Sequence, residues 1–282
     1  MPSDELWDGR GRPPSYPSLH VPIPIFLSLL SYVFCALRPS PYRKLLFIPY
    51  TALALFYVFH IRTSNLVNNF SQAGAVAQNV FTLFDLLVLT DVQRVLSRKG
   101  KTPKESPIHE KGFWERLKWS FSLVTSIRGV GWSHEPTAIL PKPTRVARTR
   151  PEFLFQSALT LVQSLGLYIL ADIAMMLDPA FQRIGPSFHA PDRPWYLRPT
   201  VLAYGLAGRA IISAVYTIAA SVSVGLGWTE PGAWPPYFGE FKEAWSVQRF
   251  WGRVWHQGMR RVSTSISVCL LAIGLELFKS AP

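Results

Sequence analysis

The sequence has few residues that could cross-link it or bind a metal. Only two cysteines occur among 282 residues, and Cys35 and Cys269 both lie inside apolar runs. A thiol in such a run behaves as a small hydrophobic side chain, so no disulfide framework is expected. The Cys and His spacings also match no metal-binding pattern, and we expect no metal site.

Charged residues are also scarce. They make up 16% of the chain, against 49% hydrophobic residues and 13% aromatics. Acidic residues are fewer than basic residues, with 17 Asp and Glu against 29 Lys and Arg, so the net charge is +12. The basic residues fall between apolar runs and accompany no nucleic-acid-binding motif, so nucleic acid is excluded as a partner and membrane lipid is favoured.

Residues 1–20 lack the basic start and apolar core of a cleavable signal peptide. We interpret them as a retained, irregular tail. Residues 21–282 then form one membrane domain, because six apolar runs follow one another. The runs are 21–37, 45–61, 73–92, 153–177, 200–228 and 262–278. The expected fold is an all-α, polytopic bundle of about six transmembrane helices.

The third run contains polar residues that point to the interior of the bundle. Gln78 and Asp85 are seven residues apart and share one helical face. A carboxylate within a membrane span favours a functional role, and a structural hydrogen bond to a neighbouring helix is the alternative.

The basic connection 93–152 holds thirteen Lys or Arg against five Glu. This charge bias predicts that the connection lies in the cytosol. Within it, residues 112–123 have the pattern of an amphipathic helix suited to the membrane interface, or of a surface helix packed on the bundle itself.

Residues 246–257, SVQRFWGRVWHQ, combine aromatic and basic side chains between two apolar runs. On a helix, Arg249, Trp251 or Arg253, and His256 recur at spacings of three and four, so one face presents guanidinium and imidazole groups. Such a face can bind an anion and move a proton. An interfacial aromatic belt without chemistry is the alternative.

Two segments resemble signatures of the wax-synthase-like acyltransferases of fungi, relatives of the membrane-bound O-acyltransferases. FWGRVWHQ resembles the signature FWGRxWHQ, and the upstream RGVGWSHE, starting at Arg128, resembles RGxGWxxE. The likeness covers roughly residues 20–278. It implies an enzyme of the endoplasmic reticulum that transfers an acyl group, here an acetyl group from acetyl-CoA, to a hydroxyl of a lipid-like terpenoid or meroterpenoid, with no bound cofactor.

Acyl transfer to a hydroxyl needs a base, oxyanion donors and cations for the phosphates of CoA. His256 is the expected catalytic base. His134 is a less favoured one, whose basicity the adjacent Glu135 would raise. The expected substrate-binding residues are Arg249, Trp251, Arg253, Gln257, Arg128, Trp132 and Glu135.

Members of this family usually continue to a later membrane helix that carries a further histidine. Here the last apolar run contains no histidine. We therefore expect a C-terminally shortened member, and a nonenzymatic structural or regulatory membrane protein is the alternative function. A transporter is disfavoured because the runs show no paired broken helices and few charges.

Overall fold

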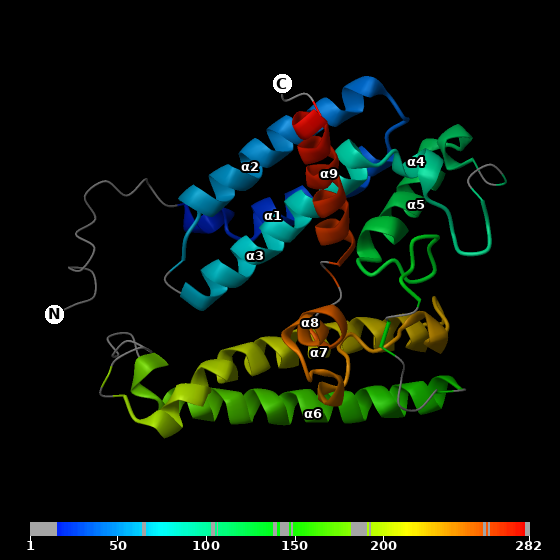
Figure 1. The fold of residues 1–282 in the computed structure, drawn as a ribbon. Helices are drawn as coiled ribbons and strands as arrows, with labels where there is room; N and C mark the ends of the chain where they lie inside the picture. The colour runs from blue at the N-terminus through cyan, green and yellow to red at the C-terminus, as the bar shows by residue number, and fades with distance from the viewer. Residues whose placement is uncertain are drawn as a thin grey trace. The chain divides into compact units, whose positions relative to one another are not determined.

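The computed structural model describes residues 16–63, 66–102, 105, 107–137, 140–141, 147, 149–181, 191, 193–255, 258 and 260–279. Throughout these residues the regular structure is helical, apart from one isolated bridge between Arg98 and Trp132 (Figure 1). The chain divides into two compact units. The first unit comprises residues 12–139 and 256–282, and the second unit comprises residues 1–11 and 140–255. Each unit is described by itself, and the single domain expected over 21–282 stays a prediction.

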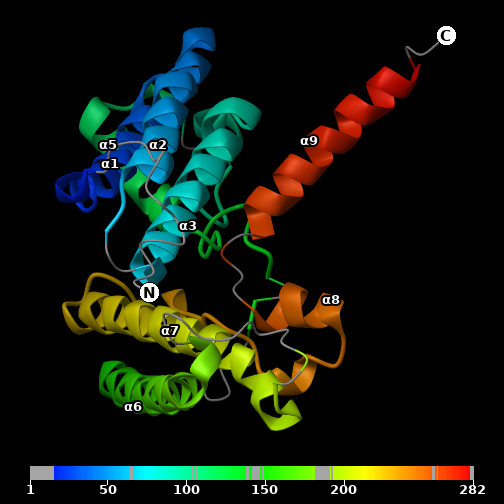
Figure 2. The same ribbon diagram turned by 90° about the vertical axis from the view of Figure 1, so that its left-hand side faces the viewer.

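The first unit is built on helices that pack side by side. They are α1 (Pro22–Ala36), α2 (Phe47–His60), α3 (Leu66–Leu83) and α5 (Phe113–Thr125). A π-helical turn, η3 (Phe84–Leu89), continues α3, and the short helix α4 (Val92–Val95) follows it. The fully buried side chains at the centre include Leu27, Tyr50, Tyr57, Leu83, Leu87 and Trp132. The beginning of helix α9 (Arg260–Lys279) contacts η3. The rest of α9 extends away from the other helices of this unit (Figure 2).

Polar side chains from later segments complete the C-terminal end of α1. The last carbonyls of a helix have no partner within the helix and need one elsewhere. Gln93 donates to the carbonyls of Cys35 and Leu37 at 2.7 and 2.6 Å. Arg116 donates from Nε to the carbonyl of Ala36 at 2.8 Å, and Arg43 donates to Leu37 at 3.0 Å. Two segments distant in sequence, around Gln93 and Arg116, and the nearby Arg43 are thereby fixed on α1.

The amphipathic helix expected at 112–123 is α5. Its polar residues Arg116 and Ser120 are buried against α1, and Ser120 donates to the carbonyl of Tyr32 at 2.7 Å. Its other face leaves Trp114 and Phe121 exposed. The alternative reading, a surface helix packed on the bundle, is therefore confirmed, while insertion of the outer face into a membrane interface stays a prediction.

The second unit is dominated by two long helices that lie side by side, α6 (Arg150–Leu177) and α7 (Val201–Gly225) (Figures 1 and 2). Small side chains are buried on both helices, and they include Ser157, Ser164, Ala171, Ala203, Ala207, Ala210 and Ala220. Small residues at such spacings let two membrane helices approach closely. Large apolar side chains such as Phe155, Val162, Leu170 and Val215 are exposed, as a lipid-facing surface requires.

Four segments of the described chain are long and apolar enough to cross a membrane. They are Pro17–Ala36, Ser71–Leu89, Arg150–Leu177 and Trp195–Gly225. These match the first, third, fourth and fifth expected spans. The second expected span is helical, but α2 has only 14 residues because the short helix η2 (Pro41–Leu46) takes up its beginning. A straight span needs about 20 residues, so by length and composition four of the about six expected spans are found in the described part of the chain.

A buried ion pair closes the connection between α6 and α7. The Asp178 carboxylate is fully buried and accepts a hydrogen bond from Arg193 Nη1 at 3.0 Å, together with further bonds from Arg193 Nη2 and the Thr200 hydroxyl. The bonds from Arg193 outweigh the effect of burial and lower the pKa of Asp178 to about 2. A carboxylate with such a low pKa stabilises the fold most when it is charged.

We expect this ion pair to make the second unit sensitive to acid. An unfolded Asp has a pKa of about 3.9, so the stabilisation is present above that pH and is lost as the pH falls towards 2. Asp178→Asn should lower the free energy of unfolding at neutral pH and reduce its change between pH 4 and 2. Unfolding by urea in detergent micelles, with Asp172→Asn as the control, measures both. An acid response of Asp178→Asn equal to that of the wild type would contradict the assignment.

Candidate functional site

Residues 128–135, the RGVGWSHE loop, follow α5 and turn sharply at two glycines. Gly129 and Gly131 have φ values of +69° and +77°, a left-handed conformation that glycine adopts without steric cost. The N–H of Trp132 donates to the carbonyl of Gly129 at 2.9 Å and closes the turn. The two glycines in the motif are therefore required by the backbone.

The indole of Trp132 anchors this loop. It is fully buried, it meets Trp119 of α5 edge to face at a centroid distance of 5.3 Å, and the guanidinium carbon of Arg98 lies 4.5 Å from the centre of its ring. Backbone hydrogen bonds from Lys99 to Gly131 and from Ser133 to Ser97 fix the loop to the segment after α4. The structure thus gives Trp132 a packing role, which the family signature alone did not reveal.

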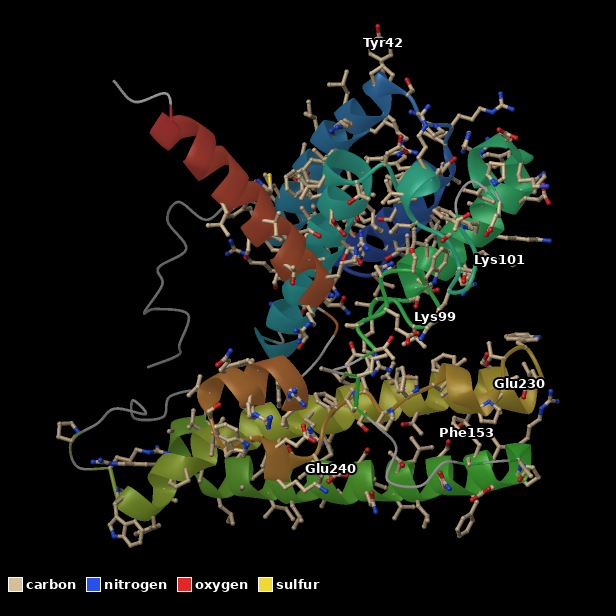
Figure 3. The ribbon with its side chains drawn as sticks, turned by 45° about the vertical axis from the view of Figure 1, so that its right-hand side comes forward. Tyr42, Lys99, Lys101, Phe153, Glu230 and Glu240 are labelled. Carbon is tan, nitrogen blue, oxygen red and sulfur yellow. The ribbon has the colours of Figure 1, made fainter. Side chains whose placement is uncertain are left out.

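Glu135 holds the same loop by electrostatic contacts. One carboxylate oxygen accepts the N–H of Gly131 at 2.7 Å, and the other accepts from Lys99 Nζ at 2.7 Å and from the Thr137 hydroxyl at 3.2 Å. Lys99 lies in the loop that follows α4 (Figure 3). Burial raises the pKa of Glu135, but these hydrogen bonds outweigh it, so the pKa is lowered overall. Glu135 therefore orients the loop, and Arg128 at the beginning of the loop is buried.

The two glycines provide a matched pair of substitutions. A Cβ atom on Gly129 would lie 2.6 Å from Cδ2 and Nε2 of His134, whereas one on Gly131 would lie no nearer than 3.6 Å to Arg98 Nη1. Alanine at either position incurs about 1–2 kcal/mol for the left-handed backbone. We expect Gly129→Ala to lower the free energy of unfolding more than Gly131→Ala does, because the imidazole of His134 must also move. Urea unfolding of both variants measures the difference, and equal losses would contradict it.

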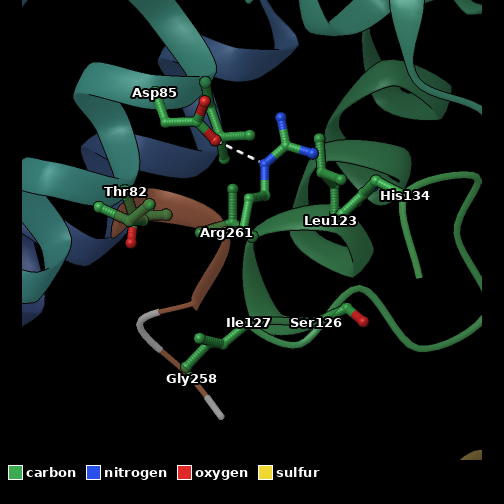
Figure 4. Close-up of a pocket in the computed structure, with 11 residues that line it drawn as sticks. Thr82, Asp85, Leu123, Ser126, Ile127, His134, Gly258 and Arg261 are labelled. Atoms are coloured by element: carbon green, nitrogen blue, oxygen red, sulfur yellow. Dashed lines mark hydrogen bonds and ion pairs between the residues drawn. The ribbon is translucent and has the colours of Figure 1, made fainter. Parts of the chain in front are cut away.

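A hollow in the first unit lies between η3, the RGVGWSHE loop and the beginning of α9 (Figure 4). We call it the Asp85 hollow. Its cavity volume is about 20 Å³, room for one small polar group, and the non-atom space rises to about 310 Å³ when the open solvent at its mouth is included. Its polar lining residues are Thr82, Asp85, Ser126, His134 and Arg261. Its apolar lining residues are Leu86, Leu123, Val124, Ile127 and Val262.

An ion pair crosses the Asp85 hollow. Nε of Arg261 lies 2.5 Å from Oδ2 of Asp85 (Figure 4). The Thr90 hydroxyl donates to Oδ1 at 3.2 Å. On the same face of α3, Gln78 donates to the carbonyl of Gly258 at 3.4 Å. The prediction that Gln78 and Asp85 face the interior is confirmed. Gln78 and Asp85 both bind residues of the segment that follows FWGRVWHQ. Arg261, the partner of Asp85, was not identified from the sequence.

His134 lines the hollow in a different state from the one expected. Burial, reinforced by the positive charge of Arg261 and opposed by Asp85, lowers the pKa of His134 to about 4. The expectation that Glu135 raises its basicity is wrong, because the Glu135 carboxylate binds Gly131 and Lys99. Nδ1 of His134 is buried and has no hydrogen-bond partner among the residues that the structure describes. At neutral pH the ring is therefore an uncharged imidazole.

The second unit contains the first part of FWGRVWHQ. Ser246 caps the short helix α8 (Val247–Arg249), and a π-helical turn, η9 (Phe250–Val254), follows it. The N–H of Trp255 donates to the carbonyl of Phe250 at 2.7 Å, and Trp255 itself is extended. The expected face with spacings of three and four is therefore not formed, since a π-turn has a longer period and the helix ends at Val254.

The aromatic side chains of this segment pack on residues 237–241. Trp255 stacks on Phe250 and meets Phe238 edge to face, and the N–H of Gly239 donates to the carbonyl of Val254 at 3.0 Å. Arg209 of α7 lies between Phe238 and Phe241, with its guanidinium carbon 4.5 Å from each ring centre. These rings hold the Arg209 guanidinium against the protein.

Of the expected substrate residues in this segment, Arg249 lies over the Trp245 ring at 4.5 Å, Trp251 is 59% exposed, and Arg253 is half-buried. The expected base His256 and its neighbour Gln257 lie outside the described residues. The boundary between the two units falls after Trp255, so FWGRVW belongs to the second unit and RGVGWSHE to the first.

Comparison with known proteins shows which protein family this chain resembles. The model of the "Membrane bound O-acyl transferase family" matches residues 234–280, which contain FWGRVWHQ. The chain is 29% identical to the acetyltransferase eriL of Hericium erinaceus over 80% of this chain and 58% of that protein. It is 31% identical to the acetyltransferase ple2 of Rhodocybe pseudopiperita over 85% of this chain and 62% of that protein. The O-mevalon transferase yanI of Aspergillus niger is 27% identical over 83% of this chain and 56% of its own length.

The chain thus spans about 60% of the length of these relatives. No solved structure matches it.

Proposed function

The chain belongs to the membrane-bound O-acyltransferase family, and from this premise we propose that it transfers an acetyl group from acetyl-CoA to a hydroxyl of a hydrophobic secondary metabolite, of the terpenoid or meroterpenoid class. The observation that carries the proposal is its similarity, over four fifths of its length or more, to two proteins named acetyltransferases. Four spans support an integral membrane protein, and we propose the endoplasmic reticulum as its location.

The proposed reaction forms an ester from an alcohol and a thioester. His256 removes the proton of the alcohol as its oxygen attacks the thioester carbonyl. The carbon–oxygen bond forms, the carbon–sulfur bond breaks, and the thiolate of CoA leaves and takes up that proton. No oxidant or metal is needed to balance this step.

Binding of the donor is assigned to the FWGRVWHQ segment. Arg249 and Arg253 would contact the phosphates of CoA through charge-assisted hydrogen bonds, and Trp251 and Gln257 would contribute further donors. The exposure of Trp251 supports its access to a substrate. In the first unit, Arg128, Trp132 and Glu135 would act by shaping the RGVGWSHE loop.

The proposal is tested with the purified 282-residue chain and with a version extended through any downstream coding sequence. Each is given acetyl-CoA and a panel of hydroxylated terpenoids, and release of the free CoA thiol is followed. We expect release that depends on both the alcohol and the protein. Alcohol-independent hydrolysis, or no release by either protein, would contradict the proposal.

A further inference from the structure

The Asp85 hollow offers an electrically neutral set of polar groups inside apolar walls. The charge of Arg261 is offset by Asp85 at 2.5 Å, and the Asp85 side chain is only 1% exposed. A cation that is already paired with a buried carboxylate has little net field to attract a phosphate or a second carboxylate. The hollow is therefore better suited to an uncharged ligand than to the phosphates of CoA.

Two groups in the hollow remain available to such a ligand. The ion pair uses Nε of Arg261, and among the described residues neither Nη1 nor Nη2 has a hydrogen-bond partner. Nδ1 of His134 is likewise buried and unpartnered. Arg261 thus supplies donors, and the uncharged imidazole of His134 can supply an acceptor. Burying a polar atom without a partner is costly, so a ligand that donates to Nδ1 of His134 is favoured.

A hydroxyl group both donates and accepts a hydrogen bond, so it matches this pair. We infer that the Asp85 hollow binds the hydroxyl of the acyl acceptor, with Nδ1 of His134 accepting a hydrogen bond from the hydroxyl and the outer nitrogens of Arg261 donating hydrogen bonds to its oxygen. The inference rests on the proposed function and names the site of the alcohol. Leu123, Ile127 and Val262 provide apolar contact for the carbon atoms beside the hydroxyl.

The position of the hollow in the chain agrees with this role. Gly258, which lines it, is the second residue after His256, the proposed base. The RGVGWSHE loop supplies His134 to the same hollow. One family signature thus lines the hollow directly, and the hollow's lining also includes Gly258, which follows the second signature in the sequence.

The test uses two probes that differ only in the hydroxyl function. Radiolabelled farnesol and the hydrocarbon farnesene are bound to the 282-residue chain in lipid nanodiscs without any acyl donor, with empty nanodiscs as the partition control. We expect farnesol to bind about tenfold more tightly, since a site built to bond a hydroxyl discriminates against an analogue that lacks it. His134→Phe should abolish this preference.

Gly129→Ala, which displaces the imidazole, should reduce the preference more than Gly131→Ala does. Equal binding of the two probes by the wild type would overturn the inference, as would an unchanged preference in His134→Phe. Because no acyl donor is present, the result is independent of catalysis. If farnesol binds in this hydroxyl-dependent way but the separate assay with acetyl-CoA detects no acetyl transfer, the proposed function is overturned and the hydroxyl site stands.

Discussion

Arg261→Ala is expected to lower the free energy of unfolding by about 3–5 kcal/mol, the cost of leaving a buried charge without its partner. The Asp85 carboxylate would remain buried with only the Thr90 hydroxyl beside it. The contact also fixes the beginning of α9 to η3. Urea unfolding in detergent micelles, followed by circular dichroism, measures the loss.

A surface ion pair and a double substitution serve as controls for this effect. Arg94 and Asp91 are 3.5 Å apart and exposed, so Arg94→Ala should cost no more than about 1 kcal/mol. Combining Asp85→Asn with Arg261→Gln removes both charges and should recover part of the loss. An Arg261→Ala variant as stable as Arg94→Ala would show that the pair does not hold the first unit together.

His256→Ala is expected to lower acetyl transfer by about 10²-fold or more in whichever form of the protein is active, which is the usual effect of removing a positioned base. The loss should appear in kcat, because the base acts on the alcohol proton during the chemical step. Rates with saturating acetyl-CoA and terpenoid alcohol measure it. Unchanged turnover would reject His256 as the base.

Arg253→Ala provides the comparison because its expected effect is on binding. Loss of one charge-assisted contact to a phosphate corresponds to about 1.5–3 kcal/mol, which should raise the KM for acetyl-CoA and leave kcat nearly unchanged. If Arg253→Ala lowered kcat as strongly as His256→Ala does, the division of roles within FWGRVWHQ would be wrong.

The sequence predicts the helices well because long apolar runs leave few alternatives in a membrane. Gln78 and Asp85 also indicate an inward face correctly, since a carboxylate in a span needs a partner. That partner, Arg261, is 176 residues away in the chain, and nothing in the local pattern identifies it. An unpaired intramembrane acid was the signal that could have prompted a search for a basic residue near another span.

Two sequence-based predictions are wrong. One assumes that residues 249–256 form a regular α-helix, and the other assumes that a residue adjacent in sequence sets the pKa of His134. The face proposed for Arg249, Arg253 and His256 assumes α-helical periodicity, but η9 is a π-turn that ends at Val254. The basicity expected for His134 assumes an influence of the adjacent Glu135. The loop turns that carboxylate towards Gly131 and Lys99 instead, and burial decides the pKa of the imidazole.

Acetyl transfer itself is the most direct test. Membranes that contain the chain, or its extended version, are incubated with acetyl-CoA labelled in the acetyl group and a hydroxylated terpenoid, and the lipid extract is examined for labelled ester. The account predicts a labelled ester that requires both the protein and the alcohol and that disappears with His256→Ala. Label that stays in acetyl-CoA or appears only as free acetate in both forms would contradict it.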